Sequence, residues 1–189
     1  VAAIELARRL KGGIDDCSSF GHGKLTEHII KGNIPSCSLA DIKKAKFIIY
    51  WGSNPQHSHA RHLSAFSYYF HPGYSEVSSV RTVEMCVVDV RESETAGVSN
   101  PFVKLSPGGD RDFIASVTQG LNQRLTKEIE QQFFDMLYKS SFSVIFAGSG
   151  LVYSLKNDFS PLIEMINKFD VNINLIPMAD QPNMRGLHT

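Results

Sequence analysis

The sequence lacks the features that mark several large classes of proteins. Its 19 basic and 19 acidic side chains give a formal net charge of zero. Binding to nucleic acid or to an anionic membrane requires a basic surface, so neither partner is expected. No apolar stretch reaches the roughly 20 residues of a membrane-spanning helix, and "VAAIELARRLKGG" is amphipathic without a signal-peptide cleavage site. We therefore expect a cytoplasmic protein.

Cysteine is also scarce. The three cysteines, Cys17, Cys37 and Cys86, are an odd number and form no Cys-x-x-Cys pair. The sequence therefore predicts neither a disulfide framework nor a zinc or iron–sulfur site. Cys86 lies in the apolar run "MCVVDV" and is interpreted as a small core residue.

What the sequence does contain is an alternation of apolar, β-branched runs with helical patterns. Hydrophobic residues make up 42% of the 189, enough for a substantial core. Strands are predicted at 46–51, 85–90, 142–148 and 173–178, and helices at 59–70, 110–125, 126–140 and 160–169. Runs that are apolar on both faces indicate a parallel sheet with helices on each side. The prediction is a doubly wound α/β fold with a mostly parallel sheet of four or five strands.

Three further local predictions concern the ends and connections of these elements. Ser38 and Asp41 form a Ser-x-x-Asp box, which predicts a helix start. The segment 71–84 has the weakest pattern and is predicted to be a surface excursion. The chain begins with valine and has no helical pattern after its last strand, so we expect an interior part of a longer or split subunit.

The predicted strand ends are unusually polar. They read "WGSNP", "VDVRESETAG", "AGSG" and "PMADQPNMRG". Taken alone, "AGSG" is more simply a tight turn, and no complete G-x-G-x-x-G motif precedes a helix, which argues against a standard nicotinamide site. Because ligands of parallel sheets bind at the carboxyl ends of the strands, their joint occurrence favours a dinucleotide-type site at this edge.

The segment "VVDVRESET" offers groups for a nucleoside. Asp89 either caps the segment that follows its strand or accepts hydrogen bonds from a ribose or a guanine edge. Arg91 can meet a phosphate through its planar guanidinium, and Ser93 and Thr95 can add hydroxyl contacts.

The segment "WGSNP" is suited to a diphosphate. Gly52 allows close approach of the backbone to a ligand, Ser53 and Asn54 offer short polar groups, and Pro55 ends the strand. Backbone amides can then hold a diphosphate. Trp51 is interpreted as a packing residue whose indole finds a local acceptor.

The seven histidines form no recognisable metal site. In "HSHARH", His57, His59 and His62 have helical spacing, but no carboxylate or thiolate completes a ligand set. They are interpreted as partly exposed residues on a helix surface. His22 lies between glycines in "FGHG" without an evident packing role, so a functional role is predicted for it.

With these motifs in this order, the chain resembles the B-type subunit of formylmethanofuran dehydrogenase, in the molybdopterin oxidoreductase superfamily. The resemblance covers nearly the whole chain and rests on "IIYWGSNPQHSHARHLS", "VVDVRESETA", "PGGDRDFI", "IFAGSGLVYS" and "IPMADQPNMRG". It implies the Rossmann-like α/β fold of that superfamily over residues 1–189. It also implies reversible reduction of carbon dioxide to formate, ahead of formylmethanofuran formation, as in methane-metabolising archaea.

The resemblance further implies a tungsten or molybdenum bis-pterin guanine dinucleotide at the strand ends. Gly52, Ser53 and Asn54 would lie near its diphosphate and pterin arm. Asp89, Arg91 and Asp110 would lie near its guanosine end. The other cofactor-binding residues implied in this way are Thr95, Gly108, Gly148, Gly150 and Asn183.

Two departures from the family pattern concern catalysis. The metal-ligating cysteine and the cysteines of a [4Fe–4S] cluster belong upstream of the segment matching "VAAIELARRL" and are absent from this chain. The arginine expected beside the metal is replaced by Ala179, and Arg185 is predicted to reach the same point. Arg185 and His22 are thus the predicted catalytic residues. The chain is either the cofactor-holding part of a catalytic oxidoreductase subunit or a degenerate relative that serves as an assembly scaffold.

The partners implied by the resemblance belong to one large complex. They are an amidohydrolase-like subunit that joins formate to methanofuran, a pterin-binding C-terminal domain, iron–sulfur subunits and an electron-bifurcating heterodisulfide reductase.

Overall fold

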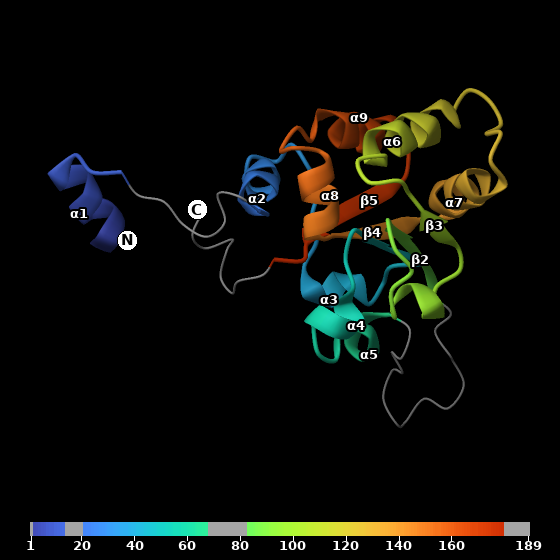
Figure 1. Ribbon diagram of the computed structural model, residues 1–189, viewed down its shortest axis with the longest axis horizontal. Coiled ribbons are helices and arrows are strands. Elements are labelled where there is room, and N and C mark those ends of the chain that lie inside the picture. Colours follow the sequence, from blue (N-terminus) through green and yellow to red (C-terminus); the bar gives the residue numbers. More distant parts are fainter. Residues whose placement is uncertain (1, 14–20, 68–82, 180–189) are drawn as a thin grey trace.

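In the computed structural model, which describes residues 2–13, 21–67 and 83–179, five strands form a single parallel sheet (Figure 1). The strands are β1 (Phe47–Trp51), β2 (Glu84–Asp89), β3 (Phe102–Lys104), β4 (Phe142–Ala147) and β5 (Asn172–Pro177). Their order across the sheet is β3-β2-β1-β4-β5, and every neighbouring pair is parallel. This confirms the predicted α/β fold with a parallel sheet of four or five strands.

The central strand β1 is buried along its whole length, because it pairs with β2 on one side and β4 on the other. Ile49, for example, lies between Cys86 and Ile145. Cys86 is fully buried, which confirms it as a core residue, and burial raises the pKa of its thiol. The short edge strand β3 was not predicted, since three residues are too few to show a period.

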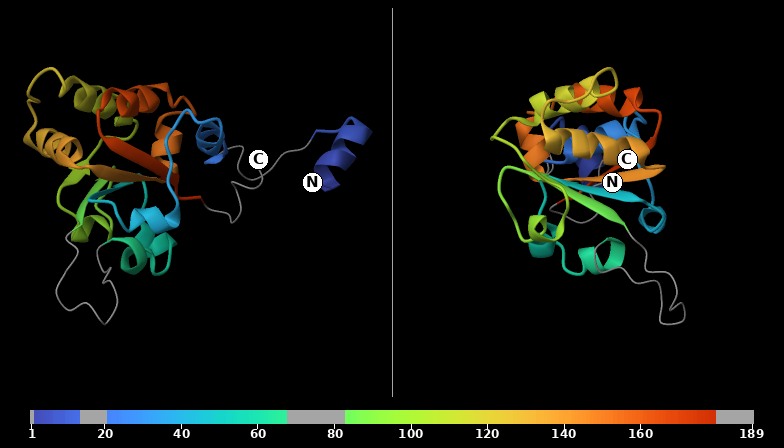
Figure 2. Two further views of the ribbon diagram at one scale, coloured as in Figure 1. Left: turned by 180° about the vertical axis from the view of Figure 1, so that it is seen from behind. Right: turned by 90° about the vertical axis from the view of Figure 1, so that its right-hand side faces the viewer.

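Helices cover both faces of the sheet, and the two layers differ in size (Figure 2). The larger layer contains α2 (Gly23–Ile30), α6 (Asp110–Gln119), α7 (Glu128–Lys139), α8 (Ser149–Ser154) and α9 (Ser160–Lys168). The smaller layer contains α3 (Leu39–Ile42), α4 (Pro55–Ser58) and α5 (His62–Phe66). Ile49 and Trp51 face the larger layer, and Ile48 and Tyr50 face the smaller one, because successive side chains of a strand alternate.

Two elements remain. The short 3-10 helix η1 (Ala96–Val98) follows β2, and its Ala96 is buried in the apolar cluster of the smaller layer. The amphipathic helix α1 (Ala2–Leu10) has no buried residue and lies apart from the sheet in Figure 1. No helix in the described ranges has the length and apolar character needed to cross a membrane.

The predicted helices after β3 are present but shorter than the pattern indicated. α6 ends at Gln119, α7 begins at Glu128 and α9 ends at Lys168. The predicted helix start at Ser38 is confirmed: Ser38 Oγ accepts a hydrogen bond from the Asp41 amide at 3.2 Å and donates one to Asp41 Oδ2 at 2.6 Å.

Three local predictions need correction. The helix predicted over 59–70 is present only as α5 (His62–Phe66) within the described residues, because Arg61 before it adopts a left-handed conformation with φ of 65°; α4 (Pro55–Ser58) precedes the predicted range. The turn predicted after β4 is the first turn of α8. Within the predicted excursion, Glu84 opens β2, and residues 71–82 lie outside the described ranges.

Candidate functional site

The carboxyl ends of β1 and β4 meet through three glycines. A Cβ on Gly52, whose φ is 61°, would overlap the backbone amide of Leu151, and one on Gly150 would lie 3.0 Å from the Gly52 Cα. Gly148 donates its amide hydrogen to Trp51 O at 2.8 Å, and Gly150 donates to Gly52 O at 3.1 Å. The predicted close backbone approach at Gly52 therefore exists, but the neighbour is the first turn of α8.

A hydrogen-bonded cluster ties the loop after β1 to the loop after β2. Asn54 Nδ2 donates to Glu94 Oε2 at 2.6 Å, and Thr95 Oγ1 donates to Asn54 Oδ1 at 2.6 Å. The Gln56 amide in turn donates to Thr95 Oγ1 at 3.2 Å, and Thr95 is fully buried. A hydrogen bond from its own backbone, followed by the one from Asn54, lowers the pKa of Glu94. Asn54 and Thr95 thus have partners within the protein and position both loops.

Trp51 and Asp110 join the end of β1 to the start of α6. The indole Nε1 of the fully buried Trp51 donates to Asp110 Oδ1 at 2.7 Å, which confirms Trp51 as a packing residue with a local acceptor. Its ring also packs edge-on against Phe113 and Phe133. Asp110, only 5% exposed, lies in the first turn of α6, where a carboxylate is favoured by the helix dipole.

Asp89 makes the capping contact that was one of its two predicted alternatives. Its Oδ1 accepts hydrogen bonds from the amides of Val90 at 2.6 Å and Arg91 at 3.4 Å. The carboxylate is thereby fixed at the end of β2, in the loop that leaves the sheet.

A cleft of about 360 Å³ opens at this edge of the sheet. Five of the predicted cofactor-binding residues line it: Gly52, Asp89, Gly108, Asp110 and Gly150. Much of the remaining wall is apolar and includes Val88, Val90, Leu105 and Pro107. Ligand pockets usually measure about 300–1,000 Å³, so this cleft suits a group the size of one mononucleotide rather than a whole dinucleotide.

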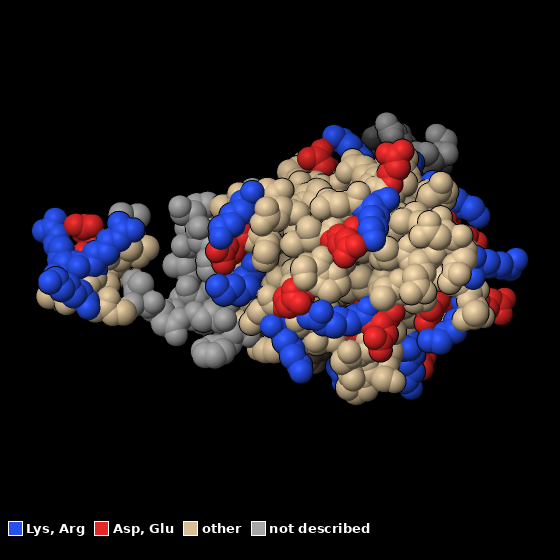
Figure 3. Space-filling view, turned by 90° about the horizontal axis from the view of Figure 1, so that it is seen from above, with Lys and Arg blue, Asp and Glu red and all other residues tan. Residues whose placement is uncertain are grey.

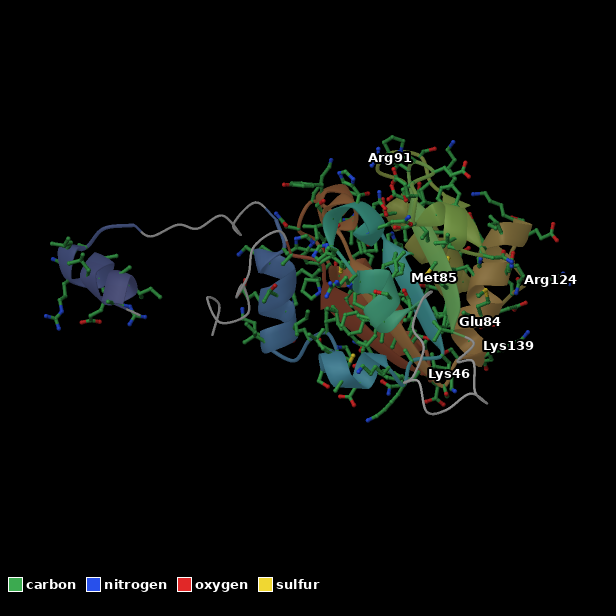
Figure 4. The ribbon with its side chains drawn as sticks, turned by 90° about the horizontal axis from the view of Figure 1, so that it is seen from below. Lys46, Glu84, Met85, Arg91, Arg124 and Lys139 are labelled. Carbon is green, nitrogen blue, oxygen red and sulfur yellow. The ribbon has the colours of Figure 1, made fainter. Side chains whose placement is uncertain are left out.

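Other predicted site residues do not line the cleft. Ser53 is buried, and its Oγ donates to Phe146 O at 3.3 Å, while Gly148 is buried beneath Gly52. Arg91 is exposed, and Figure 4 shows it at the opposite edge of the sheet from Lys46 and Lys139. Asn183 and Arg185 lie outside the described residues.

The interpretation of His22 as a loop residue without a packing role is wrong. His22 is 1% exposed and precedes α2, with its Nε2 3.1 Å from the carbonyl oxygen of Ala147 at the end of β4. Its own carbonyl accepts a hydrogen bond from Thr26 Oγ1 at 2.9 Å. His22 therefore attaches α2 to the sheet across 125 residues of sequence, a contact that no local pattern reveals.

His62 is partly exposed on helix α5, as interpreted, but one side of its ring packs into the apolar cluster of the smaller layer. Its ring packs against Phe146, Phe66 and Tyr50, with centroid distances of 4.6, 5.0 and 5.6 Å. Its Nε2 is buried and has no hydrogen-bond partner among the described residues. Burial, and to a lesser degree the charge of His59, lowers the pKa of His62 to about 4.

Two residues that sequence reasoning missed also line the cleft. Tyr153 belongs to the last turn of α8, and Lys156 follows that helix in a left-handed conformation with φ of 51°. The helix itself was not predicted, since six residues are too few for a helical period, so nothing in the sequence pointed these side chains towards the strand ends.

The chain is similar to known proteins over nearly its whole length. No protein-family model matches it. The B subunits of the tungsten-containing formylmethanofuran dehydrogenase 2 from Methanocaldococcus jannaschii and from Methanococcus maripaludis are each 25% identical to it, over 98% of this chain. The chain is a homologue of the formylmethanofuran dehydrogenase B subunit. It spans 46% of the length of each of these relatives, so it corresponds to about half of such a protein.

A solved structure has a similar fold. A chain of the formyltransferase/hydrolase complex from Methylorubrum extorquens, determined with methylofuran, matches 96% of this chain with a TM-score of 0.67. The match covers 49% of that chain at 15% identity, and it supports the α/β fold alone.

Proposed function

We propose that the chain is the cofactor-holding part of the catalytic subunit of a formylmethanofuran dehydrogenase. Its cleft would bind the guanosine arm of a pterin guanine dinucleotide. The observation that carries this proposal is the cleft itself, because five residues implied by the family resemblance line one cavity at the carboxyl edge of a parallel sheet.

The two carboxylates of the cleft suit a guanine or a ribose. Guanine presents N–H donors at N1 and N2, and ribose presents hydroxyl donors, so both need acceptors in the protein. In the described part of the chain, protein groups donate hydrogen bonds to Oδ1 of Asp89 and to Oδ1 of Asp110, and none donates to the Oδ2 atom of either residue. Each carboxylate therefore keeps a second oxygen for a ligand, and the apolar wall between them suits a flat ring.

The proposed role of this chain concerns the nucleotide arm of the cofactor and not the metal. Among the described residues, no group of three His, Cys, Asp or Glu side chains is arranged to hold a metal ion. When bound, the bis-pterin group supplies the redox chemistry that interconverts carbon dioxide and formate, and this chain positions its nucleotide arm. The names of both relatives contain tungsten, which favours tungsten over molybdenum. Arg185 would supply the cation that Ala179 cannot, and His22 would position α2 against the end of β4 rather than take part in the reaction.

The remaining parts of the enzyme would lie on other segments or subunits. Because the relatives are about twice as long as this chain, the proposal places the cluster-binding segment and the pterin C-terminal domain outside it. The amidohydrolase-like and iron–sulfur subunits would complete a cytoplasmic complex, with a heterodisulfide reductase as an electron donor.

The proposal is tested by metal and pterin analysis of the native complex purified without oxygen. We expect tungsten and about two guanine-type pterins per copy of the chain. Asp110→Asn, which removes a carboxylate of the cleft but keeps an acceptor for Trp51, should lower the pterin content. Asp112→Asn is the control, because Asp112 is exposed on the same helix and does not line the cleft. A complex with neither metal nor pterin would instead identify the chain as an assembly scaffold.

A further inference from the structure

The phosphates of a nucleotide in this cleft need donors other than the glycine amides. The Gly52 amide donates to Val88 O at 2.8 Å. Those of Gly148 and Gly150 donate to Trp51 O and Gly52 O at 2.8 and 3.1 Å. Each of these amides thus has a backbone partner. The loop after β1 and the first turn of α8 are therefore hydrogen-bonded to each other. Their glycine amides do not supply the backbone donors that were predicted for a diphosphate.

The charge of the cleft also requires a basic side chain beside the phosphates. Asp89 and Asp110 both line it, and two carboxylates repel a phosphate, most strongly where water is partly excluded. Lys156 is the one basic side chain among the described residues that line the cleft. No ion pair is formed by Lys156 within the described ranges, whereas Lys127 pairs with Glu130 at 2.7 Å. Arg91, the phosphate contact that the sequence suggested, does not line the cleft.

The neighbouring side chains suit the ring of a nucleotide. Tyr153 precedes Lys156 by three residues and is 63% exposed, although it is a large aromatic residue. Val90, in the loop after β2, is 43% exposed and lines the same cleft. Exposed apolar surface on two residues of one cleft is unfavourable in a free protein, and a ligand ring that packs against Tyr153 and Val90 would cover it.

We propose that the end of α8 is the phosphate- and ring-binding element of this cleft. The Lys156 ammonium pairs with the diphosphate, and the Tyr153 ring packs against the guanine base. The cleft then discriminates a phosphorylated guanine nucleotide from the bare nucleoside. This inference rests on the proposed function and assigns to Lys156 the role that the sequence suggested for Arg91.

The test uses the 189-residue chain, with guanosine diphosphate and guanosine as probes. Trp51 is the single tryptophan and donates to Asp110 in the cleft wall, so its fluorescence reports binding. We expect Lys156→Met to weaken guanosine diphosphate binding by about 10- to 100-fold, the effect of losing a charge-assisted hydrogen bond. Guanosine binding should stay unchanged in that variant, and Lys156→Arg should retain most of the affinity for the diphosphate. Tyr153→Ala should weaken both ligands.

Two matched variants and two outcomes decide the inference. Lys139→Met lies at the opposite edge of the sheet (Figure 4), and Arg91→Met lies outside the cleft lining, so both should bind guanosine diphosphate like the unmodified chain. If the unmodified chain binds the diphosphate and Lys156→Met binds it equally well, the role of Lys156 is wrong and the proposed function stands. If the unmodified chain binds neither ligand, and the native complex contains no guanine-type pterin, both proposals fail.

Discussion

Single glycines decide how closely β1 and α8 approach at the edge of the cleft. We predict that Gly52→Ala lowers the free energy of unfolding by about 2–5 kcal/mol, because the new Cβ meets the Leu151 amide and the position has a positive φ. Urea unfolding measures the change. Gly97→Ala is the control: nothing lies within 4 Å of the added methyl, so its effect should stay within about 0.5 kcal/mol. Equal effects of the two substitutions would contradict the packing described for Gly52.

His62 should make the stability of the chain depend on pH. Its pKa is about 4 in the folded chain against an ordinary 6.5, since burial disfavours the charged ring. Between these two values the unfolded chain binds a proton that the folded chain does not. The free energy of unfolding should therefore fall as the pH drops from about 6.5 to about 4, by at most about 1.4 kcal/mol per pH unit.

The pH prediction is checked by urea unfolding at pH 7 and pH 5. The loss of stability between these pH values should be smaller in His62→Leu than in the unmodified chain. His57→Leu provides the control, because His57 is exposed on the neighbouring helix α4. Identical pH dependence in all three proteins would show that the surroundings of the His62 ring do not lower its pKa.

At the scale of elements, the loops after β1 and β2 act as one unit through Thr95. Thr95→Val keeps the shape but leaves Asn54 Oδ1 and the Gln56 amide without this partner. We predict a loss of about 1–3 kcal/mol in the free energy of unfolding, measured in urea. The same substitution at Thr118, whose hydroxyl bonds only to Ile114 O within α6, should change it by less than about 0.5 kcal/mol. A neutral Thr95→Val would show that the two loops are independent.

Helix α8 connects the glycine contact at the end of β1 with the wall of the cleft. Its first turn packs on Gly52, and its last turn brings Tyr153 to the cleft. The sequence predicts the strand before α8 and a tight turn at the glycines where the helix begins. It did not predict the helix, because a six-residue segment carries too little periodicity to be distinguished from a turn.

At the scale of the whole molecule, one sheet separates two apolar clusters and couples them. Phe146 belongs to the cluster of the smaller layer, whereas Trp51 belongs to that of the larger layer. We predict that Phe146→Ala lowers the urea midpoint reported by Trp51 fluorescence and the midpoint reported by far-UV circular dichroism by the same amount, equivalent to about 3–5 kcal/mol. An unchanged fluorescence midpoint would show that the smaller layer unfolds independently.

The charged side chains on the face shown in Figure 3, unlike the apolar ones of the core, are not gathered into separate clusters. Figure 3 shows basic and acidic side chains interspersed over the face that α6 and α9 cover. Many pairs are local, such as Lys168 with Glu164 at 2.6 Å, and exposed pairs of this kind contribute little to stability. The charges on which the proposed function depends are those of Asp89, Asp110 and Lys156, and all three residues line the cleft.

The sequence by itself determined the class of fold, the polar strand ends at one edge of the sheet and the packing role of Trp51. These features can be predicted because the apolar run of a buried strand and the polar residues at its end are neighbours in the sequence. Only the tertiary structure decided that Gly52 faces α8, that His22 is buried, that the His62 ring packs against Phe146, and that Lys156 lines the cleft. These contacts join residues far apart in the chain, and their free energies depend on distance and burial, which exist only once the sheet has formed.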